Sequence, residues 1–556
     1  MQFIQNIGYN SLLPTTVNIK KTHIGGIKMG QKVWIVAFLL ISAWLLWWTS
    51  NNPLPDGYQN EYLHIGNAFD LFHALQEGDF WHVRWYAYTS YWPWGFYAVP
   101  WPFLWVLGGN ISTLILSNIL YLFVLLWSMH RLSIRYNSPL SPYILLFSPA
   151  VFGSLIRFEP NFANVAVTAL GVLAMAESNY FQHRQWSLVW GATLGVGLML
   201  DRLTVGFYLV PWLLAVWMHA PFRLDRLAKK NFFYASALCF ALTIAYYREF
   251  VLRHSAELLS QAPVGEIDSV GTLVLSDNPL PILYYLVSLL DTQAGFVIGC
   301  TMLVGVGYSL RQSKMDNTLL WWVLLPGLVF FSMLAKKQVY YTFPILVPLA
   351  IVAGRVPVLS WISVIAGVFL WLQQGCGVFP LAGVWSSFDR VSDSVLVKTL
   401  PPSIVEPRYL LSKPPSHTAY SVQPIIDLLV DKRYDMSPEE VVVFSEDQTW
   451  FEGFVVLQLR EYWDGHIRGI TQDPIGVWEF HTQSRYLVWI TDSTSSWPTA
   501  ESIERELQAD HYILTELPAI STAIVGMQPE FVPLGSWEIE DTKLWLFVRK
   551  DMPKQP

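Results

Sequence analysis

Long apolar runs fill most of the first two thirds of the chain. A helix that crosses a bilayer needs about 17–25 predominantly apolar residues, and the runs approach or reach that length. We therefore predict an α-helical polytopic membrane protein with about eleven transmembrane helices, all within residues 33–375. The runs lie at 33–48, 111–128, 141–157, 162–177, 187–200, 203–219, 232–247, 294–310, 318–335, 339–354 and 357–375.

The segment between the first two runs, residues 49–110, is polar and rich in aromatic side chains. Within it, the apolar stretch Trp92–Leu107 is short and is interrupted by three prolines. We expect this stretch to lie in the membrane interface, because it is too short and too broken to cross. The number of crossings is then odd. A cytoplasmic N-terminal segment, residues 1–32, therefore implies that the C-terminal part lies on the outer face.

Residues 376–556 show a different pattern. Short runs of β-branched and aromatic residues predict strands at Val441–Phe444, Leu487–Ile490, Tyr512–Leu514 and Leu544–Val548. Helix-like stretches at 425–432 and 500–509 separate them. This alternation predicts an extracytoplasmic soluble α/β domain. It contains no glycine-rich phosphate loop and no catalytic or metal-binding motif.

Charge supports this division. Only 14% of the 556 residues are charged, against about 25% in a typical soluble domain, which argues against an ordinary cytosolic enzyme. The formal net charge of −7 argues against a nucleic-acid-binding protein. Residues 1–375 hold 21 basic and 16 acidic residues, whereas residues 376–556 hold 14 and 26. The three cysteines are far apart, so neither a disulfide framework nor a zinc site is indicated.

Most Lys and Arg residues fall in short loops that this topology places in the cytoplasm, as is usual for membrane proteins. A cation on the outer side is costly unless it snorkels, pairs with an acid or binds an anion. Arg202 and Arg248 each have an acidic neighbour in the sequence, so pairing with that acid and binding of an anion both remain open. The seven outward basic residues are Arg84, Arg157, Arg202, Arg248, Arg253, Lys336 and Lys337.

Candidate chemistry lies in the first outer loop, where Asp56, Asn60, Glu61 and His64 follow the first apolar run. On a helix, Glu61 and His64 share one face. One interpretation is an interfacial helix whose acids face water. The other is a carboxylate that the aromatic surroundings partly desolvate, which suits a general base. Glu61 and His64 could supply two ligands to a divalent metal, but no third ligand is near, so a cofactor is not indicated.

The order of several motifs resembles superfamily C (GT-C) glycosyltransferases that use polyprenyl-phosphate sugars, in particular the protein O-mannosyltransferase and aminoarabinose transferase group. Asn60-Glu61 stands where that family carries an Asp-Glu pair. Other similar segments are Tyr91-Trp92-Pro93-Trp94, Arg157-Phe158-Glu159-Pro160, the stretch from Gly197 to Arg202, and the stretch from Lys336 to Pro344. The resemblance covers residues 33–375 and does not include the C-terminal domain.

This resemblance implies transfer of a sugar from a polyprenyl-phosphate donor to a lipid, glycan or protein acceptor on the outer face of the plasma or inner membrane. Glu61 or Asp56 would be the catalytic carboxylate. Arg202, Lys336, Lys337 and Arg84 would neutralise the leaving phosphate. Asn60, His64, Glu159, Tyr340 and Tyr341 would complete the site.

Two other functions fit the hydrophobic pattern. A transporter or flippase of lipid-linked glycans predicts charged residues within the spans and internal repeats, and neither is evident in the sequence. A non-catalytic membrane anchor for the C-terminal domain leaves the outward cations and the acidic first loop without a role. The glycosyltransferase is therefore the function that we expect.

Overall fold

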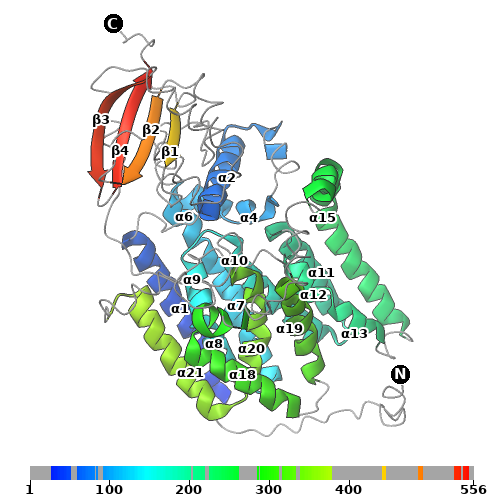
Figure 1. Cartoon of the computed structure of the whole chain (residues 1–556). Coiled ribbons are helices and arrows are strands. Elements are labelled where there is room, and N and C mark those ends of the chain that lie inside the picture. The colour runs from blue at the N-terminus through cyan, green and yellow to red at the C-terminus, as the bar shows by residue number, and fades with distance from the viewer. Residues whose placement is uncertain are drawn as a thin grey trace, which may run out of the picture.

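A computed structural model gives the arrangement of these segments (Figure 1). It describes residues 27–51, 59–81, 83–84, 92–201, 204–218, 225–261, 285–286, 288–311, 316–333, 339–378, 441–445, 486–492, 531–539 and 542–549. Up to residue 378, these residues form helices. They are α1 (Ile27–Asn51), α2 (Gln59–Gln76), α4 (Gly95–Ala98), α5 (Trp101–Leu107), α6 (Ile111–Leu116), α7 (Asn118–Arg135), α8 (Ser141–Leu146), α9 (Pro149–Leu155), α10 (Pro160–Ser178), α11 (Arg184–Leu200), α12 (Thr204–Leu209), α13 (Trp212–Met218), α15 (Arg226–Gln261), η2 (Leu289–Gln293), α18 (Phe296–Arg311), α19 (Asp316–Met333), η3 (Val339–Ile345), α20 (Leu346–Ala353), α21 (Pro357–Leu370) and η4 (Trp371–Gly375).

Within the described residues, three helical stretches are long and apolar enough to cross a membrane: Val33–Asn51, Ile111–Arg135 and Pro357–Gly375. A fourth candidate is the pair α9 and α10, which is bent by 118° at its break. Five shorter apolar helices add to these, among them Phe296–Arg311 and Leu319–Ser332. The number of crossings therefore remains a prediction.

Large apolar side chains point outward from α1 and α21. Leu40 is 62% exposed and Ile365 is 66% exposed. In water such a surface would be unfavourable, whereas lipid tails accommodate it. The outward faces of these two helices thus fit a membrane environment.

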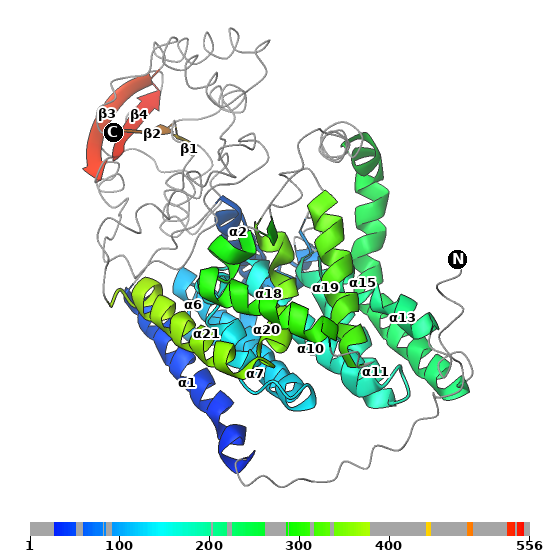
Figure 2. The same ribbon diagram turned by 60° about the horizontal axis from the view of Figure 1, so that its bottom comes forward.

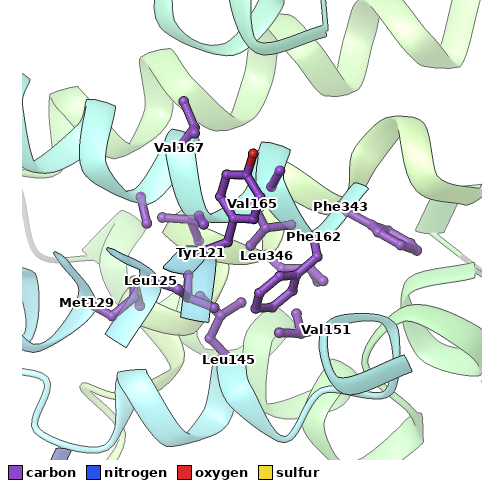
Figure 3. Close-up of a cluster of buried hydrophobic side chains, with 14 of the residues drawn as sticks. Tyr121, Leu125, Met129, Leu145, Val151, Phe162, Val165, Val167, Phe343 and Leu346 are labelled. Carbon is purple, nitrogen blue, oxygen red and sulfur yellow. The ribbon is translucent and has the colours of Figure 1, made fainter. Parts of the chain in front are cut away.

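The core of the helical bundle is centred on α10. Almost every residue of this helix is buried, and small and β-branched residues cover all of its faces. A helix that is apolar all round must pack on all sides. Figure 3 shows Phe162 and Val165 of α10 against Tyr121 and Leu125 of α7, with Leu346 of α20 beside them.

Helices α11 and α15 pack closely because α11 carries the spacing Gly191-x-x-x-Gly195. A methyl group at Gly191 would lie 2.2 Å from the carbonyl oxygen of Ala235, so only glycine allows this approach. The apolar run predicted α15 over 232–247, but the helix has 36 residues. At about 1.5 Å per residue it is roughly 54 Å long and exceeds a hydrocarbon core of about 30 Å.

A four-stranded sheet is described in the C-terminal part, with the order β1-β2-β4-β3. Its strands are β1 (Val441–Ser445), β2 (Tyr486–Asp492), β3 (Phe531–Ile539) and β4 (Thr542–Arg549). Three of the four predicted strands are confirmed, as β1, β2 and β4. Strand β3 was missed because Pro533 and Gly535 break the alternation, and the structure has a register shift between them.

Strands β1 and β2 are parallel, so the chain between them must cross over. Such a crossover is typical of α/β domains. The predicted strand Tyr512–Leu514 and the predicted helices 425–432 and 500–509 lie outside the described residues. The α/β domain and its limits, 376–556, therefore stay predictions.

The sheet and α2 lie at the same end of the helical bundle, as Figures 1 and 2 both show. Helix α1 ends near this end of the bundle, and α15 begins at the opposite end. Helix α2 and the described sheet thus lie at one end of the bundle, and the topology itself stays a prediction.

Candidate active site

Glu61 lies in the first turn of α2 and is fully buried. Its Oε1 accepts a hydrogen bond of 2.8 Å from the backbone N–H of Phe158. Phe158 lies in the break between α9 and α10, where the backbone is not helical. The break frees this N–H from helical hydrogen bonding, and Glu61 uses it.

Pro160 explains why the chain breaks there. It is the first residue of α10, where a backbone N–H has no partner within the helix, so the missing N–H of proline costs nothing. The residue before a proline is driven toward extended geometry, and Glu159 has φ −135° and ψ 153°. Asn118 of α7 holds the other side of the break, because its Nδ2 donates to the carbonyl oxygens of Leu155 at 2.9 Å and Arg157 at 2.8 Å.

Buried polar side chains surround this break. Arg157 and Glu159 are both buried, and Oε2 of Glu159 accepts a 2.6 Å bond from Nδ2 of Asn161. One turn further along α10, Nδ2 of Asn164 donates at 2.6 Å to Oδ2 of Asp201, which follows α11. We call Glu61, Arg157, Glu159, Asn161, Asn164 and Asp201 the polar cluster.

Such a cluster is costly in an apolar interior, because each charged group loses its hydration. Ionisable residues inside membrane proteins usually serve a function for this reason. The cluster joins α2, α10 and the end of α11, three segments that are far apart in the sequence. It therefore is the strongest candidate for a site in the described part of the chain.

His64 lies three residues after Glu61 on α2 and is also buried. Its Nδ1 is 2.8 Å from the hydroxyl of Tyr97 on α4. The rings of Trp92 and Phe96 lie edge-on to the His64 ring, at 4.9 Å and 5.6 Å. The segment from Trp92 to Tyr97 thus packs directly against α2, the helix that carries Glu61.

Tyr340 and Tyr341 lie in η3, a short 3-10 helix that packs against α10. The hydroxyl of Tyr208 donates to the carbonyl oxygen of Tyr341 at 2.5 Å, and the Tyr341 ring stacks on Phe331 at 5.2 Å. These contacts fix the segment that begins two residues after Lys337.

The remaining predicted site residues are placed as follows. Arg84 is exposed, and its guanidinium lies 5.6 Å from the centre of the Trp81 ring. Asn60 lies in α2, but its side chain is outside the described part. Asp56, Arg202, Lys336 and Lys337 also lie outside the described residues. Among the residues that are described, no group of three or more His, Cys, Asp or Glu side chains could hold a metal ion.

Sequence reasoning missed four members of the polar cluster as site residues: Arg157, Asn161, Asn164 and Asp201. Arg157 was already conspicuous as an outward cation next to Glu159. Asn161 and Asn164 are polar residues three apart in a run that is otherwise apolar, and that spacing was a usable signal.

Two crystal structures match this architecture: ArnT from Cupriavidus metallidurans in the apo state, with a TM-score of 0.51, and the same protein bound to undecaprenyl phosphate, with a TM-score of 0.52. Each match covers 93% of this chain and 98% of the ArnT chain. The chain has the ArnT fold. The sequence identity to ArnT is 14% in both cases.

This likeness in fold agrees with the fold that the motif resemblance implied, and the apolar helices of the described residues fit a multi-pass membrane protein. A match over 93% of the chain must include much of residues 376–556, so the likeness extends beyond the region that the motifs covered. No protein-family model and no curated protein sequence matches the chain.

Proposed function

We propose that the chain transfers a sugar from a polyprenyl-phosphate donor to an acceptor on the outer face of the membrane. The ArnT fold supports this class of reaction, and one ArnT structure holds undecaprenyl phosphate. The position of α2 and the sheet at one end of the bundle suits an acceptor that arrives on that side.

The observation that carries the proposal is the buried Glu61 held by the N–H of Phe158. A backbone N–H and the positive end of the α10 dipole both stabilise a carboxylate. The hydrogen bond also fixes the orientation of the side chain. A fixed carboxylate in a water-poor site is suited to positioning an acceptor and taking its proton.

The proposed step balances as follows. A lone pair on the acceptor oxygen or nitrogen attacks the anomeric carbon of the sugar. The bond between that carbon and the phosphate oxygen breaks, and its electron pair leaves with the polyprenyl phosphate. The acceptor proton passes to Glu61 and then to water. This displacement inverts the anomeric centre.

The leaving phosphate gains negative charge, so cations near it lower the barrier. We assign this role to Arg202, Lys336 and Lys337. Arg202 directly follows Asp201, which is bound to α10, and Lys337 lies two residues before η3, which packs on α10. Arg157 joins this set because it is buried beside the Glu61 partner Phe158. Arg84, which is exposed, is proposed as an outer contact of the donor.

Glu61→Gln tests the carboxylate, because it keeps the size of the side chain and removes its basicity. Purified full-length protein in nanodiscs is incubated with a panel of undecaprenyl-phosphate hexoses and pentoses that carry a radiolabel. We expect transfer or hydrolysis by the wild type and a loss of at least about 100-fold in Glu61→Gln, within the range of general-base effects.

Glu177→Gln is the matched control. Glu177 forms an ion pair of 3.5 Å with Arg131 far along α10 from the break, so its loss is expected to leave transfer unchanged. Asp56→Asn decides between the two carboxylates that the sequence left open. Full activity in Glu61→Gln, with loss in Asp56→Asn, would overturn the assignment of Glu61.

A further inference from the structure

Three described contacts and one shared helix face form a closed circuit that includes Glu61. Glu61 is bonded to the N–H of Phe158 at 2.8 Å, and the ring of Phe158 stacks on Phe96 at 4.7 Å. The Phe96 ring contacts the His64 ring edge-on at 5.6 Å. The circuit closes within α2, because His64 and Glu61 lie on one face of that helix.

Hydrogen bonds among Asn67, Tyr97 and His64 hold the His64 ring in place. Nδ2 of Asn67 donates to the Tyr97 hydroxyl at 3.2 Å, and that hydroxyl is 2.8 Å from Nδ1 of His64. An amide N–H can only donate, so the Tyr97 oxygen accepts from Asn67. The Tyr97 hydroxyl can still donate to Nδ1 of His64 or accept from it, so the two side chains are hydrogen-bonded in either neutral tautomer of the ring.

The partner helix α4 is itself anchored at the polar cluster. A methyl group at Gly95 would lie 2.6 Å from the carbonyl oxygen of Met199, so the α4 backbone touches the end of α11. Met199 lies two residues before Asp201, which is bonded to Asn164. Tyr97 is therefore a fixed point to which His64 attaches α2.

We propose that His64 is a positioning residue, which holds Glu61 in place through its hydrogen bond to Tyr97 and its contact with Phe96. The inference rests on the proposed function of Glu61 and adds to it a residue that touches no reacting atom. Small displacements of a catalytic group are costly, because about 1 Å of misplacement can reduce a rate by roughly 100-fold.

Two substitutions of His64 separate the hydrogen bond from the bulk of the ring. The amide of asparagine places its polar atoms near the position of Nδ1, whereas the amide of glutamine places them near Nε2. We expect His64→Gln and Tyr97→Phe to lower kcat by about 10- to 100-fold, with the KM for the undecaprenyl-phosphate donor changed by less than about threefold. His64→Asn is expected to retain at least about tenfold more activity than His64→Gln.

His73 provides the matched control, since it lies near the end of the same helix, away from Glu61, and its ring stacks on Phe69. His73→Gln is expected to keep the wild-type kcat. All rates are divided by the fraction of monodisperse protein, so that a loss of folded protein is not counted as a loss of kcat. Wild-type kcat in both His64→Gln and Tyr97→Phe, or equal losses in His64→Asn and His64→Gln, would overturn the inference.

A structural arm distinguishes failure of this inference from failure of the proposed function. If the wild type turns over none of the donors, the proposed function has failed. An electron cryomicroscopy structure of His64→Gln then tests positioning alone, through the distance between Oε1 of Glu61 and the backbone nitrogen of Phe158. A lengthening beyond hydrogen-bond distance supports positioning by His64, and an unchanged 2.8 Å refutes it.

Discussion

The bond between Asn164 and Asp201 ties the end of α11 to α10, at 2.6 Å and in a buried position. A hydrogen bond to a charged group contributes about 1.5–3 kcal/mol. Because Arg202 follows Asp201 directly, the bond also restrains the segment that we assign to the donor phosphate. Asn164→Leu keeps the branched shape of the side chain and removes the donor, and we expect it to weaken binding of undecaprenyl phosphate by about tenfold, measured by microscale thermophoresis.

Asn231→Leu is the control for this experiment. Asn231 is equally buried, but its Nδ2 donates to the carbonyl oxygen of Phe181 at 2.8 Å, between α15 and the turn before α11. Its substitution is expected to lower the melting temperature by a few degrees without changing the affinity for undecaprenyl phosphate. Equal affinity losses in the two variants would mean that Asn164 acts only through stability.

At the residue scale, sequence reasoning found the individual groups better than their partners. Glu61, His64 and Glu159 were recognisable because each stands near a predicted membrane boundary. The bond from Asn164 to Asp201 joins positions 37 residues apart, and nothing in local spacing identifies such a pair. The pairing of Arg248 with Glu249 was easier to predict, since the two are adjacent, and it is present at 3.8 Å.

At the scale of elements, the position of the short helix α4 depends on the missing methyl group of Gly95. In Gly95→Ala the new Cβ would lie 2.6 Å from a backbone oxygen of Met199, and the backbone cannot give way as a side chain can. Overpacking of this kind costs about 1–3 kcal/mol. We expect α4 to move away from α11 and kcat to fall by about tenfold, because Tyr97 moves with it.

Gly109→Ala is the matched control, since a methyl group at Gly109, in the same first loop, meets no atom within 4 Å. Thermal unfolding and turnover are measured for both variants. If Gly95→Ala were as active and as stable as Gly109→Ala, the contact between α4 and α11 would be irrelevant to the site.

Element boundaries were less predictable than element types. The two apolar runs at 141–157 and 162–177 predicted two simple spans, but the first is divided into α8 and α9, and α9 and α10 meet at 118°. Pro160 accounts for the start of α10, but the angle depends on Asn118 and on the rest of the packing. Helix α15 continues past its apolar run because the residues that follow include good helix formers such as Glu, Leu and Arg.

At the scale of the whole molecule, the hydrophobic pattern and the distribution of charge sufficed to predict a membrane protein with a different C-terminal part. They did not show that α2, α10 and the end of α11 meet, since this depends on long-range packing. The arrangement of these segments around one buried carboxylate is what the ArnT fold adds to the motifs.

The two ends of the bundle provide a direct test of orientation. Glu77 follows α2 at one end and is exposed, whereas Lys229 is exposed near the start of α15 at the other end. Glu77→Cys and Lys229→Cys are introduced singly after Cys239, Cys300 and Cys376 have been replaced by alanine. The variants are then exposed to a membrane-impermeant maleimide in intact and in permeabilised cells.

We expect Glu77→Cys to react in intact cells and Lys229→Cys to react only after permeabilisation, because the basic start of α15 should face the cytoplasm. A reporter fused after Pro556 should score as extracytoplasmic, since the sheet lies at the same end as α2. Labelling of both variants after permeabilisation verifies that each cysteine is accessible. Reaction of Lys229→Cys in intact cells, with protection of Glu77→Cys, would invert the topology and place Glu61 on the cytoplasmic side.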